Sequence, residues 1–375
     1  MPDTGGLVNG WREASLGDVL TLQRGFDLPA RDRVDGPVPI VSSSGVTGWH
    51  DVAKAEPPGV VIGRYGSLGS VHWITEPYWP LNTSLWVKDF KGNDPRYLSY
   101  LMRTISIDGS SASAVPGVNR NHLHRLPVLV PSVDTQRRIA AVLSAIDELI
   151  EINVHRIDLL EGLAASLYHE WFVRFRFPGH EAMEFVDSVL GRIPAGWAPT
   201  RLCDLAALRY GKPLPAATRR PGPYPVVSSA GVVGEHDEAI VPAPGIVIGR
   251  KGNIGSVWWI DQPFFPIDTT YYVETSIPLG LMYWQLRDLA FIDSHAAVPG
   301  LSREQAYGLF VLAVDDSLAT RFDAIHRVCF DSVEALRGQN RRLAVTRDLL
   351  LPRLVTGRLD LSEVDLGDLL TAELS

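Results

Sequence analysis

Apolar residues recur in alternating steps of four and three between Thr135 and about Arg174. This is the heptad pattern of a helix that packs lengthwise against another helix. It continues through more than four heptads, so it predicts one helix of about 40 residues, roughly 60 Å long. The predicted seam consists of Ile139, Leu143, Ile146, Ile150, Asn153, Ile157, Leu160, Ala164, Leu167 and Trp171.

A second seam runs from about Ala319 to Leu354 and is less regular, because it contains His326 and Arg347. Its members are Phe322, His326, Cys329, Val333, Leu336, Asn340, Leu343, Arg347, Leu350 and Leu354. Each seam has one asparagine, Asn153 or Asn340, and a single buried asparagine often fixes the register of a coiled coil at some cost in stability. We therefore predict that the two asparagines pair. The alternative, in which both face solvent or a partner, stays open.

The rest of the chain consists of short β-type runs broken by glycine and proline, and these runs occur twice. "GPVPIVSSSGVTGWHD" (36–51) returns 186 residues later as "GPYPVVSSAGVVGEHD", and "PPGVVIGRYGSLGSVHWI" (57–74) returns as "APGIVIGRKGNIGSVWWI". "AVPGVNR" (114–120) returns 183 residues later as "AVPGLSR". The repeats predict an α+β fold in which two similar domains are joined by two long helices packed as an antiparallel coiled coil, with pseudo-two-fold symmetry. Two copies of one surface suit a target that also has two parts.

These patterns divide the chain into six predicted segments. The two α+β domains occupy 1–133 and 196–316, and the two long helices occupy 134–176 and 317–358. An irregular connector with two prolines covers 177–195, and an acidic tail covers 359–375.

Charge and cysteine content narrow the class of protein. The formal net charge is −8, and the acidic tail, which has no Lys or Arg after Arg358, supplies five of these negative charges. The rest of the chain is close to neutral, which leaves room for basic patches. Cys203 and Cys329 show no disulfide or metal spacing, which indicates a reducing cytosol and hence a cytoplasmic protein. No signal peptide and no membrane span are expected, because no apolar run reaches about 18 residues.

Motifs that would indicate catalysis are missing. The sequence has no phosphate-binding loop, no zinc-protease helix, no serine-hydrolase elbow and no paired Cys-x-x-Cys. It also lacks the Asn-Pro-Pro or Asp-Pro-Pro tetrapeptide of amino-methyltransferases. We expect no catalytic residue and no metal site.

Recognition is better supported, because four polar loops occur in both copies. The residues predicted to bind DNA are Ser42, Ser43, Ser44, Arg64, Tyr65, Ser67, Asn82, Thr83, Asn119 and Arg120 in the first copy, and Ser228, Ser229, Arg250, Lys251, Asn253, Asp268, Thr269, Ser302 and Arg303 in the second. Such side chains suit base edges: arginine pairs with guanine, asparagine with adenine, aspartate with cytosine, and serine with several bases. Another interpretation stays open, in which the arginines are solvated turn residues and the serine hydroxyls stabilise turns.

Several stretches together resemble one family. "IVSSSGVTGWHD" and "IVIGRKGNIGSVWWI" resemble the target-recognition-domain signatures of the specificity (S) subunit of type I restriction–modification systems. "VPSVDTQRRIAAVLSAIDELIEIN", "LLEGLAASLYHEWFVRFRFP", "LGRIPAGW" and "NRRLAVTRDLLLPRLVTGRLDL" resemble its conserved helices and the start of its second recognition domain, in the same order. "VDDSLATRFDAIH" departs from the pattern, since it lacks the Pro and Gln of "PSVDTQRRIAAVL", and this leaves the start of the second helix open.

The resemblance implies a chain without catalytic activity whose two recognition domains each read one half of a bipartite site in double-stranded DNA. The helices would hold the halves at a fixed spacing. Two modification (methyltransferase) subunits would dock on the chain and bind S-adenosylmethionine, and restriction subunits would add ATP- and Mg-dependent translocation and cleavage. The chain itself would bind no cofactor.

Two other functions stay open on the sequence alone. A stand-alone DNA methyltransferase would transfer methyl groups without any partner. A structural coiled-coil adaptor would show no sequence-dependent affinity for DNA even with its partners present.

Overall fold

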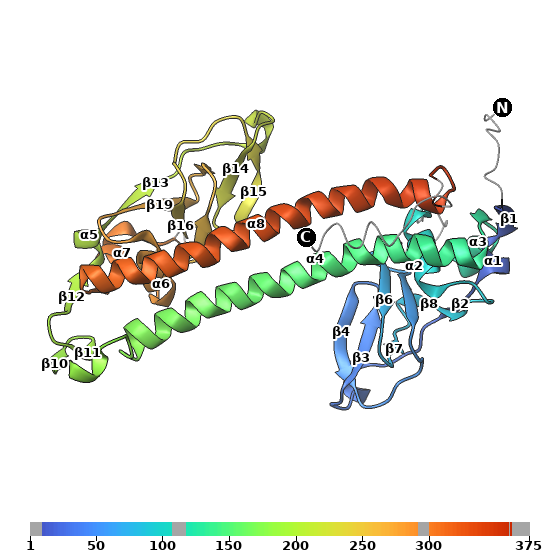
Figure 1. Ribbon diagram of the computed structural model, residues 1–375, viewed down its shortest axis with the longest axis horizontal. Helices are drawn as coiled ribbons and strands as arrows, with labels where there is room; N and C mark the ends of the chain where they lie inside the picture. Colours follow the sequence, from blue (N-terminus) through green and yellow to red (C-terminus); the bar gives the residue numbers. More distant parts are fainter. Residues whose placement is uncertain (1–9, 107–117, 292–299, 360, 362–375) are drawn as a thin grey trace. The chain divides into compact units, whose positions relative to one another are not determined.

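The protein is described by a computed structural model that covers residues 10–106, 118–291, 300–359 and 361. It divides into two compact units: unit 1 comprises Met1–Ile152 and Asn340–Ser375, and unit 2 comprises Asn153–Gln339. The division falls inside both long helices, so each helix contributes residues to both units (Figure 1). The six predicted segments therefore do not coincide with the compact units. Apart from Leu359 and Leu361, the predicted acidic tail lies outside the described residues.

Unit 1 is built on an antiparallel sheet of four strands in the order β2-β8-β5-β6, beside a three-stranded sheet β4-β3-β7 and the pair β1-β9. In its described residues the strands are β1 (Arg12–Ser15), β2 (Thr21–Arg24), β3 (Val38–Ser42), β4 (Gly45–His50), β5 (Gly59–Gly63), β6 (Val71–Ile74), β7 (Trp79–Pro80), β8 (Ser84–Asp89) and β9 (Pro127–Val130).

Unit 2 repeats this plan with the orders β13-β19-β16-β17, β15-β14-β18 and β12-β20, and adds the hairpin β10-β11. Its strands are β10 (Phe185–Ser188), β11 (Gly191–Pro194), β12 (Ala198–Arg201), β13 (Ala206–Tyr210), β14 (Tyr224–Ser228), β15 (Gly231–His236), β16 (Gly245–Gly249), β17 (Val257–Ile260), β18 (Phe265–Pro266), β19 (Thr270–Thr275) and β20 (Phe310–Ala313). The repeated sequence thus forms the same sheets twice.

The apolar runs "GVVIG" and "GIVIG" form strands that are buried on both faces, because successive side chains of a strand point to opposite sides. In β5, Val60 and Ile62 pack into the main core of unit 1, while Val61 packs into a second cluster with Tyr78. The equivalent residues of β16 divide in the same way, with Val247 in a separate cluster beside Phe264.

Short helices cover the sheets. They are α1 (Leu16–Val19), α2 (Pro95–Thr104) and α3 (Arg120–His124) in unit 1, and α5 (Leu202–Leu205), α6 (Leu279–Asp288) and α7 (Arg303–Gly308) in unit 2. Helix α2 begins at a proline, and the side chain of Asp94 caps it by accepting a hydrogen bond from the backbone nitrogen of Tyr97 at 2.8 Å.

Both predicted long helices are confirmed as α4 (Val133–Tyr168) and α8 (Asp316–Val355). All residues of the two predicted seams are buried or half-buried, as the heptad pattern requires. The first helix was predicted to reach about Arg174, and its last part is instead a π-helical turn, His169–Val173. The seam residue Trp171 lies in this turn and is still buried.

The helices pair antiparallel within each unit. In unit 1, Asn340 donates to the carbonyl of Ile150 at 3.3 Å, and Arg347 donates to Asp147 at 3.0 Å. In unit 2, Asn153 donates to the side-chain oxygen of Gln339 at 3.1 Å. Because Asn153 is 0% exposed, the alternative in which both asparagines face solvent is wrong. The direct pairing of Asn153 with Asn340 stays a prediction.

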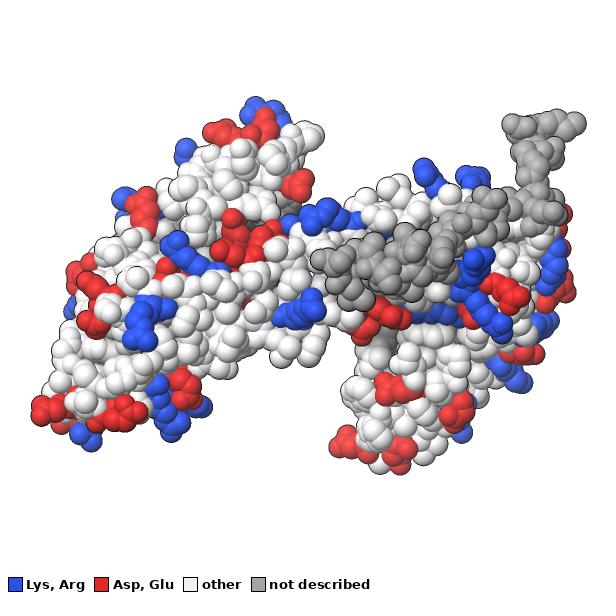
Figure 2. Space-filling model, in the orientation of Figure 1, with Lys and Arg blue, Asp and Glu red and all other residues white. Residues whose placement is uncertain are grey.

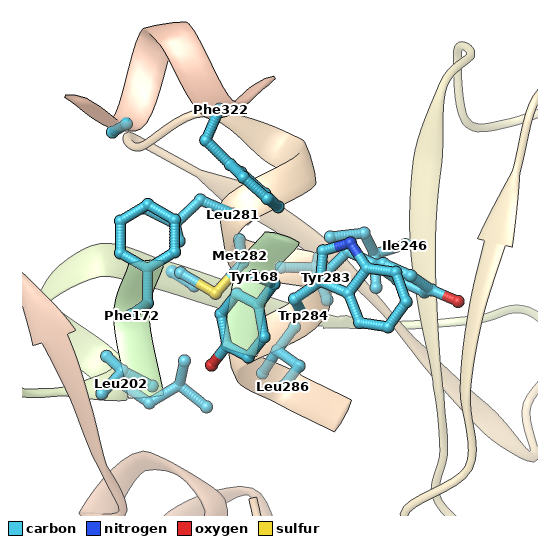
Figure 3. Packing of buried hydrophobic residues seen from close by; sticks show 14 of the residues in the cluster. Tyr168, Phe172, Leu202, Ile246, Leu281, Met282, Tyr283, Trp284, Leu286 and Phe322 are labelled. Atoms are coloured by element: carbon cyan, nitrogen blue, oxygen red, sulfur yellow. The ribbon is translucent and has the colours of Figure 1, made fainter. Parts of the chain in front are cut away.

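The core of unit 2 contains a group of packed aromatic side chains (Figure 3). Tyr168 and Phe172 of the first helix segment, Trp284 of α6 and Phe322 of α8 pack together, with centroid separations between 5.2 and 6.2 Å for the pairs that involve Tyr168 or Phe322. These contacts hold α6 against the helix pair. Because α6 also packs on β16 and β17, the sheet of unit 2 is held in place through α6.

Candidate functional site

The four polar loops of unit 1 converge on one surface. The carbonyl of Ser43 accepts hydrogen bonds from the hydroxyl of Ser70 and from Nε2 of His72, the latter at 3.1 Å. The backbone nitrogens of Arg64 and Tyr65 donate to the carbonyl of Thr83 at 3.1 and 3.2 Å, and the nitrogen of Val118 donates to the carbonyl of Arg64 at 3.1 Å. We call the loops 42–44, 64–70, 82–83 and 118–120 surface 1.

Unit 2 builds the same arrangement from the second copy. The carbonyl of Ser229 accepts from the hydroxyl of Ser256 at 2.7 Å and from Nε1 of Trp258 at 3.1 Å. The nitrogens of Arg250 and Lys251 donate to the carbonyl of Thr269 at 2.8 and 3.1 Å, and that of Leu301 donates to Arg250 at 2.8 Å. We call the loops 228–230, 250–256, 268–269 and 301–303 surface 2.

The loops fold back closely on the strands, and this requires glycine at one position of each copy. A Cβ atom on Gly63 would lie 1.9 Å from the carbonyl oxygen of Ser67, and one on Gly249 would lie 2.0 Å from that of Asn253. No larger residue fits at these points, so the repeated glycines are explained by loop geometry.

Several predicted DNA contacts have structural roles within the loops. The hydroxyl of Ser42 accepts from the nitrogen of Ser44 at 3.2 Å, and that of Ser228 accepts from Ala230 at 3.1 Å, so both stabilise hairpin turns. Asn119 caps α3 by accepting from Asn121 at 2.9 Å, and Ser302 caps α7 by accepting from Gln305 at 3.4 Å. The turn interpretation thus holds for Ser42 and Ser228, whereas Asn119 and Ser302 are helix caps.

The other predicted contacts differ in exposure. The hydroxyls of Thr83 and Thr269 are buried and have no hydrogen-bond partner among the described residues. Ser43 and Ser229 are also buried and contribute their carbonyls. The side chains that reach solvent fully or in part are Ser44, Arg64, Tyr65, Ser67, Asn82, Arg120, Arg250, Lys251, Asn253, Asp268 and Arg303.

Two equivalent arginines are held in place by contacts with uncharged groups. The guanidinium of Arg64 lies over the ring of Tyr65 at 4.5 Å, and its Nε donates to the carbonyl of Val118 at 3.4 Å. Arg250 donates from Nη1 to the carbonyl of Asp268 at 2.9 Å. Among the residues that the structure describes, neither arginine forms an ion pair with a carboxylate. Positioned cations of this kind can bind phosphate or read guanine.

Sequence reasoning missed some side chains beside these surfaces. Trp258, next to surface 2, is 37% exposed, because it points away from Trp259, which packs on Tyr283 of α6. His72 is the equivalent residue next to surface 1. The signal was present in the sequence, since adjacent residues of a strand face opposite sides and only one of Trp258 and Trp259 can face the core.

Charges on the face of the molecule shown in Figure 2 are mixed, with basic and acidic side chains interspersed over both units. No group of three or more His, Cys, Asp or Glu side chains is arranged for a metal ion within the described ranges. In the same part of the chain, no helix is long and apolar enough to cross a membrane.

Comparisons with known proteins bear on this arrangement. Residues 9–162 match a family model described as type I restriction modification DNA specificity domain. The MjaIX specificity subunit of a type I restriction enzyme from Methanocaldococcus jannaschii is 22% identical over 301 residues, which are 72% of this chain and 70% of that protein. The EcoprrI specificity subunit from Escherichia coli is 24% identical over 149 residues, 38% of this chain and 37% of its own length.

The fold is similar to that of a solved type I restriction–modification S subunit from M. genitalium. The TM-score is 0.64 at 16% identity, and the match covers 95% of this chain and 98% of the other. The resemblance read from the sequence is therefore confirmed, as is the α+β fold with two long helices.

Proposed function

We propose that the chain, which is similar to specificity subunits of type I restriction–modification systems, reads a DNA site in two parts, one part with surface 1 and the other with surface 2. The observation that carries the proposal is the convergence of four loops through hydrogen bonds to backbone carbonyls, which occurs in both units at equivalent residues. A rigid backbone frame places loop side chains at fixed positions, as reading base edges requires.

The side chains on this common frame differ between the two units. Tyr65 and Ser67 of surface 1 are replaced by Lys251 and Asn253 in surface 2, and Asn82 is replaced by Asp268. Each base pair presents its own pattern of donors and acceptors in the major groove. Two surfaces with one frame and different side chains are therefore suited to two different half-sites.

The helix pair is proposed to be the scaffold for the partners. It exposes large apolar side chains at Leu159, Leu163 and Val328 in unit 2, and at Val345 and Leu349 in unit 1. Exposed apolar residues on a helix pair are typical of surfaces that other subunits cover. We assign this role to two modification subunits that carry S-adenosylmethionine, with restriction subunits supplying ATP- and Mg-dependent steps. The chain itself is proposed to be cytoplasmic, non-catalytic and free of cofactors.

A matched pair of substitutions tests the reading of two half-sites. Arg64→Ala and Arg250→Ala remove equivalent guanidinium groups, and each should relax base discrimination in one half-site by about 1–3 kcal/mol. The chain is assembled with its modification subunits, and its affinity is measured for DNA in which each half-site is altered in turn. An equal loss on both halves, or no loss in either variant, would contradict the proposal.

The same assembly separates the proposal from the other two functions. Methyl transfer by the purified chain alone would indicate a stand-alone methyltransferase. DNA binding without any sequence preference in the complete assembly would indicate a structural adaptor.

A further inference from the structure

A tyrosine next to surface 2, Tyr210, contacts two guanidinium groups of that surface. The ring of Tyr210 lies 5.0 Å from the guanidinium carbon of Arg250 and 5.1 Å from that of Arg303. Tyr210 is 47% exposed, so the group lies at the surface of unit 2. Neither arginine forms an ion pair within the described part of the chain, whereas the neighbouring Arg209 pairs with Glu274 at 2.8 Å.

The fold places these residues together for a simple reason. Tyr210 ends β13 and Arg250 follows β16, and both strands flank β19 in the sheet. Tyr271 of β19 lies opposite Tyr210, with ring centroids 5.0 Å apart, and its buried hydroxyl donates to the carbonyl of Leu301 at 3.0 Å. Burial raises the pKa of Tyr271 to about 12, so this hydroxyl stays protonated and keeps donating its hydrogen bond to Leu301.

Asp268 lies beside this group and is exposed. Its carbonyl accepts the hydrogen bond from Nη1 of Arg250, which leaves its carboxylate to other partners. The equivalent residue of unit 1, Asn82, donates instead to the side chain of Asp27, and Pro213 occupies the position of Asp27 in unit 2. The two surfaces therefore differ in chemistry at this point, although their backbones agree.

We propose that Arg250 and Asp268 together read one G·C base pair in the half-site of unit 2, and that Tyr210 is the positioning residue that orients Arg250. The inference rests on the proposed function and makes it more specific. Guanine presents two acceptors, O6 and N7, to a guanidinium, and the paired cytosine presents an N4 donor to a carboxylate. A guanidinium on one base and a carboxylate on the other thus complement both edges of the same pair.

Unit 1 is predicted to lack an equivalent of the group formed by Tyr210, Arg250 and Asp268. Arg24 occupies the position of Tyr210, and Leu85 of β8 occupies that of Tyr271, so no tyrosine pair is present there. Arg64 stacks on Tyr65 of its own loop instead. The base preferences of the two half-sites should differ for this reason.

The test uses the chain assembled with its modification subunits and a set of duplexes in which each base pair of the unit 2 half-site is substituted in turn. Competition binding gives the discrimination at each position. With the unaltered chain, replacing the proposed G·C pair should weaken binding by about 5- to 150-fold. Arg250→Ala and Tyr210→Ala should reduce this ratio to below about threefold at that position alone, and Asp268→Asn should lower it at the same position.

Conservative and neighbouring substitutions distinguish positioning from folding. Tyr210→Phe keeps the ring and should retain the discrimination of the unaltered chain, and Arg209→Ala, next to it on β13, should change nothing. Arg250→Lys keeps the positive charge but not the bidentate donors of the guanidinium. This variant should therefore retain affinity for DNA and lose discrimination at the G·C pair. The inference fails if these variants leave every position of the half-site unchanged, or if the position they alter is an A·T pair. Absence of any sequence preference in the unaltered assembly would instead overturn the proposed function itself.

Discussion

Single residues determine the chemistry of each surface, and the sequence shows only part of this. The repeat identified Arg64 and Arg250 as equivalent, and both lie in surface loops. It did not show that Ser42 and Ser228 are occupied by hydrogen bonds to their own turns. The sequence does not distinguish a serine that stabilises a turn from one that faces a ligand, because the difference lies in backbone geometry.

His326 is a core residue whose surroundings also could not be read from the sequence. The sequence marks it as a polar residue in an apolar seam, and the structure buries it completely. Its ring stacks on Phe330 with centroids 4.1 Å apart, and neither ring nitrogen has a hydrogen-bond partner among the described residues. Burial lowers the pKa of His326 to about 4, against the opposing effect of Asp323.

This histidine should make the stability of unit 2 depend on pH. As pH falls below about 6.5, the unfolded chain binds a proton that the folded chain excludes, so stability decreases until the pH falls below about 4. The free energy of unfolding of His326→Leu minus that of the unaltered chain should increase by about 2–3 kcal/mol when the pH is lowered from 7.5 to 4.5. Urea unfolding at the two pH values measures it.

His155 on α4 supplies the control, because its side chain is exposed. The difference between His155→Leu and the unaltered chain should be the same at both pH values. A constant difference for His326→Leu as well would show that the buried imidazole is not the cause.

Among the elements, the long helices were the easiest to predict, since a heptad seam is sustained and unmistakable in sequence. The residues through which each long helix contacts its neighbouring elements were not predictable. Asp147 of α4 lies among three arginines and Tyr100, whereas the residue 183 positions later, Phe330 of α8, lies among aromatic rings. The backbone is repeated, but an ionic contact has replaced an apolar one.

The ionic contact joins α2, α4 and α8 within unit 1. The carboxylate of Asp147 accepts from the hydroxyl of Tyr100 at 2.7 Å, from Arg347 at 3.0 Å, and from Arg96 and Arg103 at 3.5 and 3.4 Å. Burial disfavours ionisation of Asp147, but the hydrogen bonds from Tyr100 and Arg347 outweigh it and hold the pKa below its usual range.

Removing this carboxylate should loosen α2. We expect Asp147→Ala to destabilise unit 1 by about 2–4 kcal/mol, because three partly buried guanidinium groups lose their shared partner. Hydrogen–deuterium exchange should accelerate in peptides from α2 and stay unchanged in α6, its equivalent in unit 2. Glu274→Gln breaks the exposed pair with Arg209 and should have a much smaller effect on stability, because solvent screens that pair. Equal effects of the two substitutions would refute the role given to Asp147.

For the whole molecule, duplication is the property that the sequence revealed most completely. Two copies of one fold, each with its own loop side chains, were predictable because the framework residues are repeated, first 186 and then 183 residues apart. The division into compact units was not, since each long helix contributes to both. Heptad positions indicate that a helix is packed along its length, but they do not indicate which domain it packs against.

The resemblance to type I specificity subunits implies that the helix pair sets the distance between half-sites. Deleting residues 154–160 of α4 together with 332–338 of α8 removes one heptad from each helix and leaves Asn153 and Gln339 in place. Seven residues correspond to about 10.5 Å of helix, or about 3 base pairs of DNA. The preferred spacer should shorten by about this amount. Deletion from one helix alone should abolish assembly, and an unchanged spacer in the double deletion would contradict this role.

The most direct test maps methylated bases by long-read sequencing in cells that contain the modification subunits, with and without this chain. The account predicts a motif of two short half-sites separated by a fixed spacer, and this motif should vanish when the chain is absent. Methylation of the same motif without the chain, or a motif that forms one uninterrupted block, would contradict it.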